Sequence, residues 1–231
     1  MALKSDLESD IGNVFSQSWE ETVGRVVPVP NDVGLNNKVV YLENAVVLYA
    51  DLDGSTKMVA ENKWEFSAEI YKSFLLSAAK IIKSENGAIT SYDGDRIMAI
   101  FIGAEKYDRA VRSALKIRWV VLNVIQPRMQ KNWSTEFKVK HTVGIDASNL
   151  RAVRTGVRGD NDLVWVGNAA NWAAKLTTLP NAYSTYITQA VYQNLSGACK
   201  ISNNKSMWEL AVWSQQNNKP IYRSHWTWSI N

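Results

Sequence analysis

Two aspartates, Asp51 and Asp95, occupy positions in the sequence that are well suited to chemistry. Asp51 follows the apolar run Ala45 to Ala50, and Asp95 comes directly after the pair Asp93-Gly94. The apolar run predicts a buried strand that ends in a carboxylate. Asp93-Gly94 favours a tight type I′ turn, which would place Asp95 at the tip of a hairpin. If strand and hairpin lie side by side, the two carboxylates meet although they are distant in the sequence.

Two carboxylates without an obvious basic neighbour repel each other unless a cation lies between them. Mg²⁺ suits such a pair because it takes hard oxygen ligands, usually one or two carboxylates together with substrate phosphates. Two such ions about 4 Å apart can activate a hydroxyl group and hold a triphosphate. The alternative is purely structural, with Asp93 and Asp95 as turn formers and Asp51 as a helix cap. These residues alone leave both interpretations open.

The segment between the strand and the hairpin must position the two carboxylates. Residues Glu65 to Ser84 have the apolar spacing of an amphipathic helix. Its apolar positions are Ile70, Phe74, Leu75, Ala78, Ala79 and Ile82. The hairpin strands are expected at Ala88 to Tyr92 and Arg96 to Ile102. A strand, a helix and an antiparallel hairpin in this order predict an α+β fold, the opening of a ferredoxin-like βαββαβ unit.

The rest of the chain continues this pattern. Tyr107 to Gln126 is predicted to be a helix that ends at Pro127, and Phe137 to Ile145 alternates like a half-buried strand. Thr185 to Thr188 and Tyr222 to Ile230 are expected to be strands. The tryptophans of this last stretch are expected to pack in the core or at a subunit seam rather than to stack on bases: Trp208, Trp213, Trp226 and Trp228.

Four motifs, taken in their order along the chain, resemble those of a known enzyme family. They are Tyr-Ala-Asp-Leu-Asp-Gly-Ser-Thr, Gly-Asp-Arg-Ile-Met-Ala-Ile-Phe, Val-Gly-Ile-Asp and Trp-Val-Gly-Asn-Ala-Ala-Asn-Trp-Ala-Ala-Lys-Leu. Between Val46 and Leu179 the chain resembles the class III nucleotidyl cyclases. The resemblance implies a homodimer with two active sites at the subunit interface. Each site would convert a nucleoside triphosphate into a 3′,5′-cyclic monophosphate and pyrophosphate.

The resemblance also assigns roles in the first half of the site. Asp51, Asp95 and the backbone carbonyl of Leu52 would ligate two Mg²⁺ or Mn²⁺ ions. One ion would lower the pKa of the ribose 3′-hydroxyl and the other would hold the β and γ phosphates. Backbone N–H groups between Asp53 and the start of the next helix would receive phosphate oxygens; this segment contains Gly54, Ser55 and Thr56.

The second half of the site would come from the other subunit. Gly167 is expected to begin a helix on which Asn171 and Lys175 share one face. In the family, an asparagine at this position orients the ribose, and usually an arginine stabilises transition-state charge. Lys175 keeps the positive charge but lacks the bidentate fork of arginine. Family members also place a triphosphate-binding lysine near the last hairpin, where Lys219 and Arg223 are the candidates.

Three positions bear on the base. Purine-specific members carry base-reading side chains where this chain has Ser91 and Val164, and neither can reproduce the adenine-reading pair. Tyr49 lies two residues before Asp51, so it shares a strand face with it and would narrow the pocket. These features resemble the pyrimidine cyclases of bacterial Pycsar anti-phage systems, which make cyclic UMP or cyclic CMP. UTP is favoured as substrate; CTP and a purine triphosphate are the alternatives.

The Pycsar resemblance further implies synthesis upon infection and a separate effector protein that reads the cyclic nucleotide. Residues 38–231 would form the catalytic domain, and residues 1–37 an N-terminal helix and linker. The helix is predicted within residues 1–22, with a stripe of Leu7, Ile11, Val14, Phe15 and Trp19. Val26 to Asn37 is expected to be a loop. Because this linker is short, the helix is favoured as a packing or dimer element over a sensor.

Composition limits the remaining possibilities. The 231 residues carry a net charge of +4 with a pI near 9.0, which suits an anionic substrate or nucleic acid equally. Cys199 is the single cysteine, which excludes an internal disulfide and fits a reducing cytoplasm.

No apolar run approaches 20 residues, so no membrane span is predicted. The arginines of the expected dimerisation arm favour a solvated or subunit-facing role over phosphate or RNA binding: Arg151, Arg154 and Arg158.

Three other classes of protein are alternatives to a nucleotidyl cyclase. A diguanylate cyclase needs a Gly-Gly-Asp/Glu-Glu-Phe hairpin, which Tyr-Asp-Gly-Asp-Arg does not match. A catalytically inactive dimeric regulator is suggested by Lys175 but opposed by the two retained carboxylates. A module that binds nucleic acid directly lacks a recognition motif in this chain. His141 and His225 are given no catalytic role, since activation of the hydroxyl by a metal needs no protein base.

Overall fold

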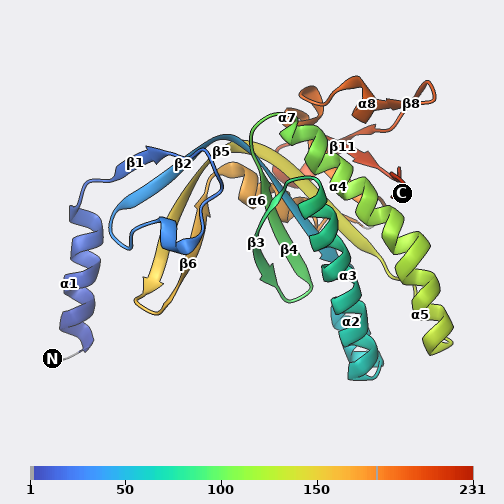
Figure 1. Cartoon of the computed structure of the whole chain (residues 1–231), viewed down its shortest axis with the longest axis horizontal. Coiled ribbons are helices and arrows are strands. Elements are labelled where there is room, and N and C mark those ends of the chain that lie inside the picture. The colour runs from blue at the N-terminus through green and yellow to red at the C-terminus, as the bar shows by residue number, and fades with distance from the viewer. Residues whose placement is uncertain (1–2, 181, 231) are drawn as a thin grey trace.

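The computed structural model describes residues 3–180 and 182–230. Within them, nine strands form one strongly curved sheet, in the order β10-β11-β7-β5-β2-β4-β3, with β1 paired to β2 and β6 paired to β5 (Figure 1). These strands are β1 Glu20–Val23, β2 Lys38–Leu52, β3 Ala88–Asp93, β4 Arg96–Phe101, β5 His141–Val157, β6 Asp160–Val166, β7 Thr185–Thr188, β10 Glu209–Trp213 and β11 Lys219–Ser224. A separate small hairpin pairs β8 Ile201–Ser202 with β9 Lys205–Ser206.

The helices cover the two faces of this sheet differently. They are α1 Leu3–Ser16, α2 Ser55–Glu61, α3 Trp64–Ser84, α4 Lys106–Val120, α5 Gln126–Trp133, α6 Asn168–Leu176, α7 Gln189–Gln193 and α8 Gly197–Lys200. The main core lies under α3 and α4, where fully buried Phe74 and Ala114 pack with strand residues such as Leu48. On the opposite face α6 packs its alanines, including Ala173, against strands β5 and β2. No helix within the described ranges is long and apolar enough to cross a bilayer.

The order β2-α3-β3-β4-α4-β5 confirms the predicted βαββαβ unit. One close approach in this unit depends on glycine. A Cβ atom built on Gly144 of β5 would lie 2.1 Å from the carbonyl oxygen of Ala173 in α6. A side chain at residue 144 would therefore displace α6 from the sheet. The sequence Val-Gly-Ile-Asp thus sets how closely α6 can lie over the strands that hold the candidate site.

Several local predictions need correction. The hairpin turn is Gly94-Asp95, because Asp93 pairs with Arg96 across the strands. Of the two turn residues only Gly94 has a positive φ, which fits a type II′ turn rather than type I′. The helix that begins at Lys106 does not end at Pro127. It continues through a π-helical segment, Val121–Ile125, into α5, where Pro127 occupies the first turn and needs no N–H partner.

Two predicted strands have different bounds. The strand expected from Phe137 begins at His141 and runs on to Val157. The strand expected from Tyr222 to Ile230 ends at Ser224. Beyond it the chain is extended and anchored by its tryptophans, and the N–H of Trp228 bonds to the Leu115 carbonyl. All four tail tryptophans pack against the hydrophobic core, as predicted: Trp208, Trp213, Trp226 and Trp228.

The N-terminal extension is helical over a shorter range than predicted. Residues 1 and 2 lie outside the described residues, and α1 ends at Ser16, so Trp19 follows the helix. Glu20–Val23 then form β1, which pairs in parallel with the start of β2. The loop from Val26 to Asn37 is confirmed and contains one short 3₁₀ turn. The division of domains at residue 37 stays a prediction.

The long strands β2 and β5 project from one end of the sheet and carry β1 and β6 (Figure 1). We call this projection the wing, and it comprises residues 20–23, 38–42 and 150–166. Two arginines of the wing, Arg151 and Arg154, make internal contacts. Arg151 bonds to Glu21 at 2.6 Å, and Arg154 bonds to the carbonyl of Val33 and the side chains of Asn31 and Asn161.

Candidate active site

Strands β2 and β4 bring the two expected carboxylates together. The antiparallel register places Asp51 opposite Arg96, the residue next to Asp95. The Arg96 Nη2 donates to Asp51 Oδ2 at 3.0 Å. The expectation that the pair lacks a basic neighbour is therefore wrong. The register decides this, because it places a residue of the hairpin directly across from the end of β2.

The carboxylates are held in a partly desolvated cluster. Burial raises the pKa of Asp51, the hydrogen bond and charge of Arg96 oppose this shift, and the nearby Asp95 adds to it. Asp95 Oδ2 is buried without a hydrogen-bond partner among the described residues. Such an oxygen, close to a second carboxylate, is suited to receive a hard cation. The two side chains and the neighbouring Leu52 carbonyl thus form a donor set that fits a divalent ion.

Asp53 is a third acidic residue that the sequence interpretation did not assign. Thr142 Oγ1 lies 3.1 Å from each Asp53 carboxylate oxygen. Burial raises the pKa of Asp53 to about 6, and the charge of Asp51 contributes. The spacing Asp-Leu-Asp signals this proximity, since residues two apart share a strand face. Within the described ranges no three His, Cys, Asp or Glu side chains are arranged to hold a metal ion.

The start of α2 lies directly after this cluster. Gly54 precedes the helix, and Ser55 and Thr56 form its first turn, as expected. The Asp53 N–H, however, donates to the Lys140 carbonyl at 3.0 Å. It is therefore engaged within the sheet, and only the amides that follow it are candidates for phosphate binding. That role of Gly54, Ser55 and Thr56 stays a prediction.

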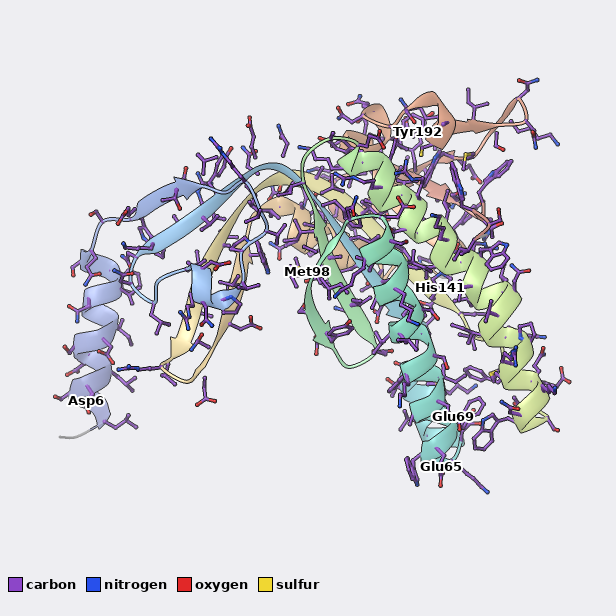
Figure 2. The ribbon with its side chains drawn as sticks, viewed as in Figure 1. Asp6, Glu65, Glu69, Met98, His141 and Tyr192 are labelled. Carbon is purple, nitrogen blue, oxygen red and sulfur yellow. The ribbon has the colours of Figure 1, made fainter. Side chains whose placement is uncertain are left out.

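Two of the three positions predicted to select the base lie in one row across the sheet. Ser91 pairs with Met98, and Met98 pairs with Tyr49, so all three side chains point to the α6 face. Figure 2 shows Met98 on the central hairpin. The Arg96 guanidinium lies 6.0 Å from the centre of the Tyr49 ring. Val164 instead lies on the wing, paired with Val153 and about half exposed.

Helix α6 presents the second set of predicted residues outward. It begins after Gly167, as expected. Trp172 and Leu176 pack toward β7, β10 and β11, while the alanines face β5 and β2. Asn171 and Lys175 are exposed on the remaining face. No hydrogen bond or ion pair within the described residues joins their side chains to the carboxylate cluster.

The two basic candidates near the last hairpin have different surroundings. Lys219 Nζ lies 3.6 Å from the ring centre of Trp172, the residue after Asn171. Arg223 forms an ion pair with Glu209 and lies over the Tyr183 ring. Lys219 is therefore placed beside the outward residues of α6. The guanidinium of Arg223 is already occupied by a carboxylate.

Neither histidine is placed for proton transfer in this site. His141 is buried under α3 against Phe74, and burial lowers its pKa to about 3 (Figure 2). A histidine with so low a pKa stays neutral at physiological pH. His225 stacks on Tyr183 just after β11, and β7 and β5 separate β11 from β2 in the sheet.

Known structures share this architecture at low sequence identity. The adenylyl cyclase CyaB from P. aeruginosa matches with a TM-score of 0.66 and 19% identity, over 80% of this chain and 95% of that one. The guanylate cyclase domain of RhGC from Catenaria anguillulae, solved in complex with GTP, matches with a TM-score of 0.63 and 17% identity, over 81% and 99% of the two chains. The fold is that of the class III nucleotidyl cyclases.

Sequence comparison narrows this class. No protein-family model matches the chain. A curated protein of Xanthomonas perforans named uridylate cyclase is 50% identical over 233 residues, covering 100% of both chains. The chain belongs to the uridylate cyclase family.

Proposed function

We propose that this protein converts UTP into 3′,5′-cyclic UMP and pyrophosphate. The observation that carries the proposal is the Asp51 and Asp95 pair, with its unpartnered buried oxygen, in a chain of the uridylate cyclase family. The reaction joins the ribose 3′-oxygen to the α-phosphorus and breaks the bond between the α-phosphorus and the bridging oxygen. The 3′-hydroxyl loses its proton, and pyrophosphate leaves.

The carboxylate cluster is proposed to hold two divalent cations, Mg²⁺ or Mn²⁺. Asp51, Asp95 and the Leu52 carbonyl supply hard oxygen donors. When bound, the cations supply Lewis acidity toward the 3′-hydroxyl and the phosphates. Arg96 has a role of its own, since its bond to Asp51 balances the charge of that carboxylate before a cation arrives. Cation binding at Asp51 then competes with the guanidinium.

The active enzyme is proposed to be a homodimer with composite sites. Asn171 and Lys175 point away from their own sheet, where a second subunit can present its carboxylate cluster to them. Asn171 would orient the ribose, and Lys175 would stabilise charge that develops on the phosphoryl group. Lys219, held beside Trp172, is the better placed of the two triphosphate-binding candidates. Arg223 would first have to leave Glu209.

Pyrimidine selection is proposed to rest on Tyr49, with Ser91 and Val164 completing the pocket. The Tyr49 ring is partly buried on the same strand face as Asp51, so it limits the depth available to a base. Ser91 can donate or accept a hydrogen bond, which is compatible with uracil or cytosine. CTP therefore remains the alternative substrate. The product is proposed to serve as a signal for a separate effector protein in phage defence.

The test is a product assay. Purified protein is incubated with Mg²⁺ or Mn²⁺ and with ATP, GTP, CTP or UTP separately, and products are identified by mass. Cyclic UMP from the UTP reaction supports the proposal. Cyclic CMP as the sole product would show that CTP is the substrate instead. A purine product would refute the role given to Tyr49. Absence of product in every reaction contradicts the enzymatic proposal.

A further inference from the structure

Strand β10 forms one edge of the sheet and, within the described residues, pairs only with β11. Sheet edges in soluble proteins are usually protected by a bulge, a proline or lysines, because free backbone groups recruit other strands. Strand β3, at the opposite end of the strand order, carries a register shift between Ile89 and Ser91. The residues of β10 pair without a shift and include no lysine or proline. The β10 edge is therefore open to a further strand.

The backbone of β10 directs two of its residues toward this open edge. Antiparallel strands alternate between hydrogen-bonded and non-hydrogen-bonded pairs. Val212 lies opposite Pro220, which has no N–H, so this pair is of the second kind, as is the pair of Leu210 and Tyr222. The N–H and C=O groups of Leu210 and Val212 therefore point away from β11. No hydrogen bond among the described residues reaches these four groups.

A hollow lies beside β10 on the face of the sheet that α6 covers. It has a volume of about 260 Å³, and its lining includes Ala211 and Trp213 of β10 together with Pro180, Tyr186 and Ile221. The side chains of Trp213, Tyr186 and Ile221 are buried in one cluster, which fixes the floor of the hollow. Every second side chain of a strand added to the edge would point to this face. The hollow suits a side chain with an apolar body.

The opposite face of β10 presents a second apolar surface. Leu210 is 60% exposed and Val212 64%. Leu210 lies opposite Tyr222, whose ring stacks on that of Tyr192 with the ring centres 3.7 Å apart. Figure 2 shows Tyr192 on α7, at the end of the molecule that carries the C-terminal strands. The remaining side chains of an added strand would cover Leu210 and Val212.

Charge around this edge favours an acidic partner. Residues 182–230 contain four basic side chains and one carboxylate: Lys200, Lys205, Lys219, Arg223 and Glu209. The carboxylate is already paired with the arginine. No ion pair among the described residues engages the three lysines, and Lys200 Nζ lies 5.2 Å from the Tyr192 ring centre, near the exposed Leu210. Aspartate or glutamate in a bound segment would complement these lysines.

We infer that β10 binds an extended acidic segment of another protein, which adds to the sheet as a further strand. The backbone of this segment bonds to the outward groups of Leu210 and Val212, and its side chains alternate between the hollow and the exposed Leu210 face. A second copy of this chain fits the edge less well, because its own β10 brings no free carboxylate to the lysines. Neither Leu210 nor Val212 has a part in the proposed catalysis, so the inference goes beyond the proposed function.

The test begins with random peptides of about ten residues that are selected on the full-length protein. Enriched peptides are synthesised and titrated by fluorescence anisotropy, and alternating apolar residues with aspartate or glutamate between them are expected. Leu210→Lys places a charge on the edge and should raise the Kd at least tenfold. Leu76→Lys, the same change at a residue of α3 that is 54% exposed, is the matched control and should change the Kd less than twofold. Enrichment of no peptide, or equal affinity for the two variants, would overturn the inference.

Methylation of peptide nitrogens separates an added strand from other modes of binding. Methyl groups on alternate amides remove the donors from one edge of an extended peptide and leave the other edge intact. One alternate pattern should therefore weaken binding at least tenfold and the other less than twofold. Hydrogen exchange at the amides of Leu210 and Val212 should slow when the unmethylated peptide binds. Equal losses from both patterns would indicate a helical peptide and refute the added strand.

These experiments need no nucleotide, which separates them from the test of the proposed function. Leu210→Lys should form cyclic nucleotide at the wild-type rate, because no candidate site residue is changed. Peptide binding by a protein that makes no cyclic nucleotide would keep this inference and reject the cyclase proposal. Sedimentation velocity examines the remaining occupant. Self-association of the wild type that Leu210→Lys abolishes would assign the edge to a second copy and overturn the inference.

Discussion

The two halves of the candidate site differ in how their side chains are held. Asp51 and Asp53 are partly buried, and each is already bonded, to Arg96 and Thr142 respectively. Asn171 and Lys175 are exposed, and their side chains form no hydrogen bond within the described residues. The first half is preorganised by its own sheet and contains mutual repulsion among carboxylates. The second half instead leaves its side chains exposed to solvent.

The largest expected effect comes from removing a carboxylate of the preorganised half. Asp95→Asn should lower the rate of cyclic nucleotide formation by about 10³-fold, because a cation ligand is lost while the fold stays intact. Asp93→Asn, an exposed neighbour in the same hairpin, is the matched control and should keep near wild-type activity. Turnover at different metal concentrations measures both. Undiminished product from Asp95→Asn would exclude this residue as a metal ligand.

The next prediction tests whether the halves come from different subunits. Asp95→Ala and Asn171→Ala should each be nearly inactive alone. Random mixing makes half of the dimers mixed, each with one intact site, so activity should recover to about a quarter of the wild-type level. Native mass spectrometry confirms the mixed dimer. A confirmed mixed dimer that stays inactive would contradict assembly in trans.

A smaller effect is expected when a residue predicted to select the nucleotide base is changed. Tyr49→Ala should change the ratio of kcat/KM for ATP and UTP by about tenfold in favour of the purine, because it removes a ring that fills the pocket. Tyr41→Ala, on the same strand but over Arg151 in the wing, is the control and should leave the ratio unchanged. Competition assays with both nucleotides measure it. An unaltered ratio in Tyr49→Ala would show that residues other than Tyr49 select the base.

The smallest expected effect concerns the stability lost when Asp53 ionises within the carboxylate cluster. In the folded state the pKa of Asp53 is raised to about 6. The free energy of unfolding therefore falls as the pH rises from about 4 to 6, because the carboxylate ionises more readily in the unfolded chain. Asp53→Asn should therefore be more stable than wild type by about 1 kcal/mol at pH 7, allowing for solvent screening of a partly exposed group. The gain should vanish near pH 4.

Urea unfolding in the absence of divalent cations measures this difference. Asp93→Asn serves again as the control, since Asp93 is exposed and should show no comparable pH-dependent gain. A gain of equal size at pH 4 and pH 7 would show that it does not arise from ionisation of Asp53.

Local signals in the sequence determined much of the fold. The amphipathic spacing of residues 65–84 predicted α3 to within one residue of its start, and Gly167 correctly marked the start of α6. The apolar run before Asp51 predicted strand β2, and the hairpin pattern predicted β3 and β4, whose turn contains Asp95. Such signals succeed because strand alternation, helix periodicity and turn chemistry depend on residues that are close in the chain.

The tertiary structure decided the contacts that no local pattern contains. Arg96 meets Asp51 because of the register between β2 and β4, and Thr142 meets Asp53 because β5 lies on the other side of β2. Lys219 meets Trp172 only after β11 has joined the sheet beside α6. Pairing between distant segments fixes these partners, so their charges and pKa values follow from the register. The sequence by itself determined which residues could do chemistry, and the packing of strands decided which of them are already paired and which are left exposed.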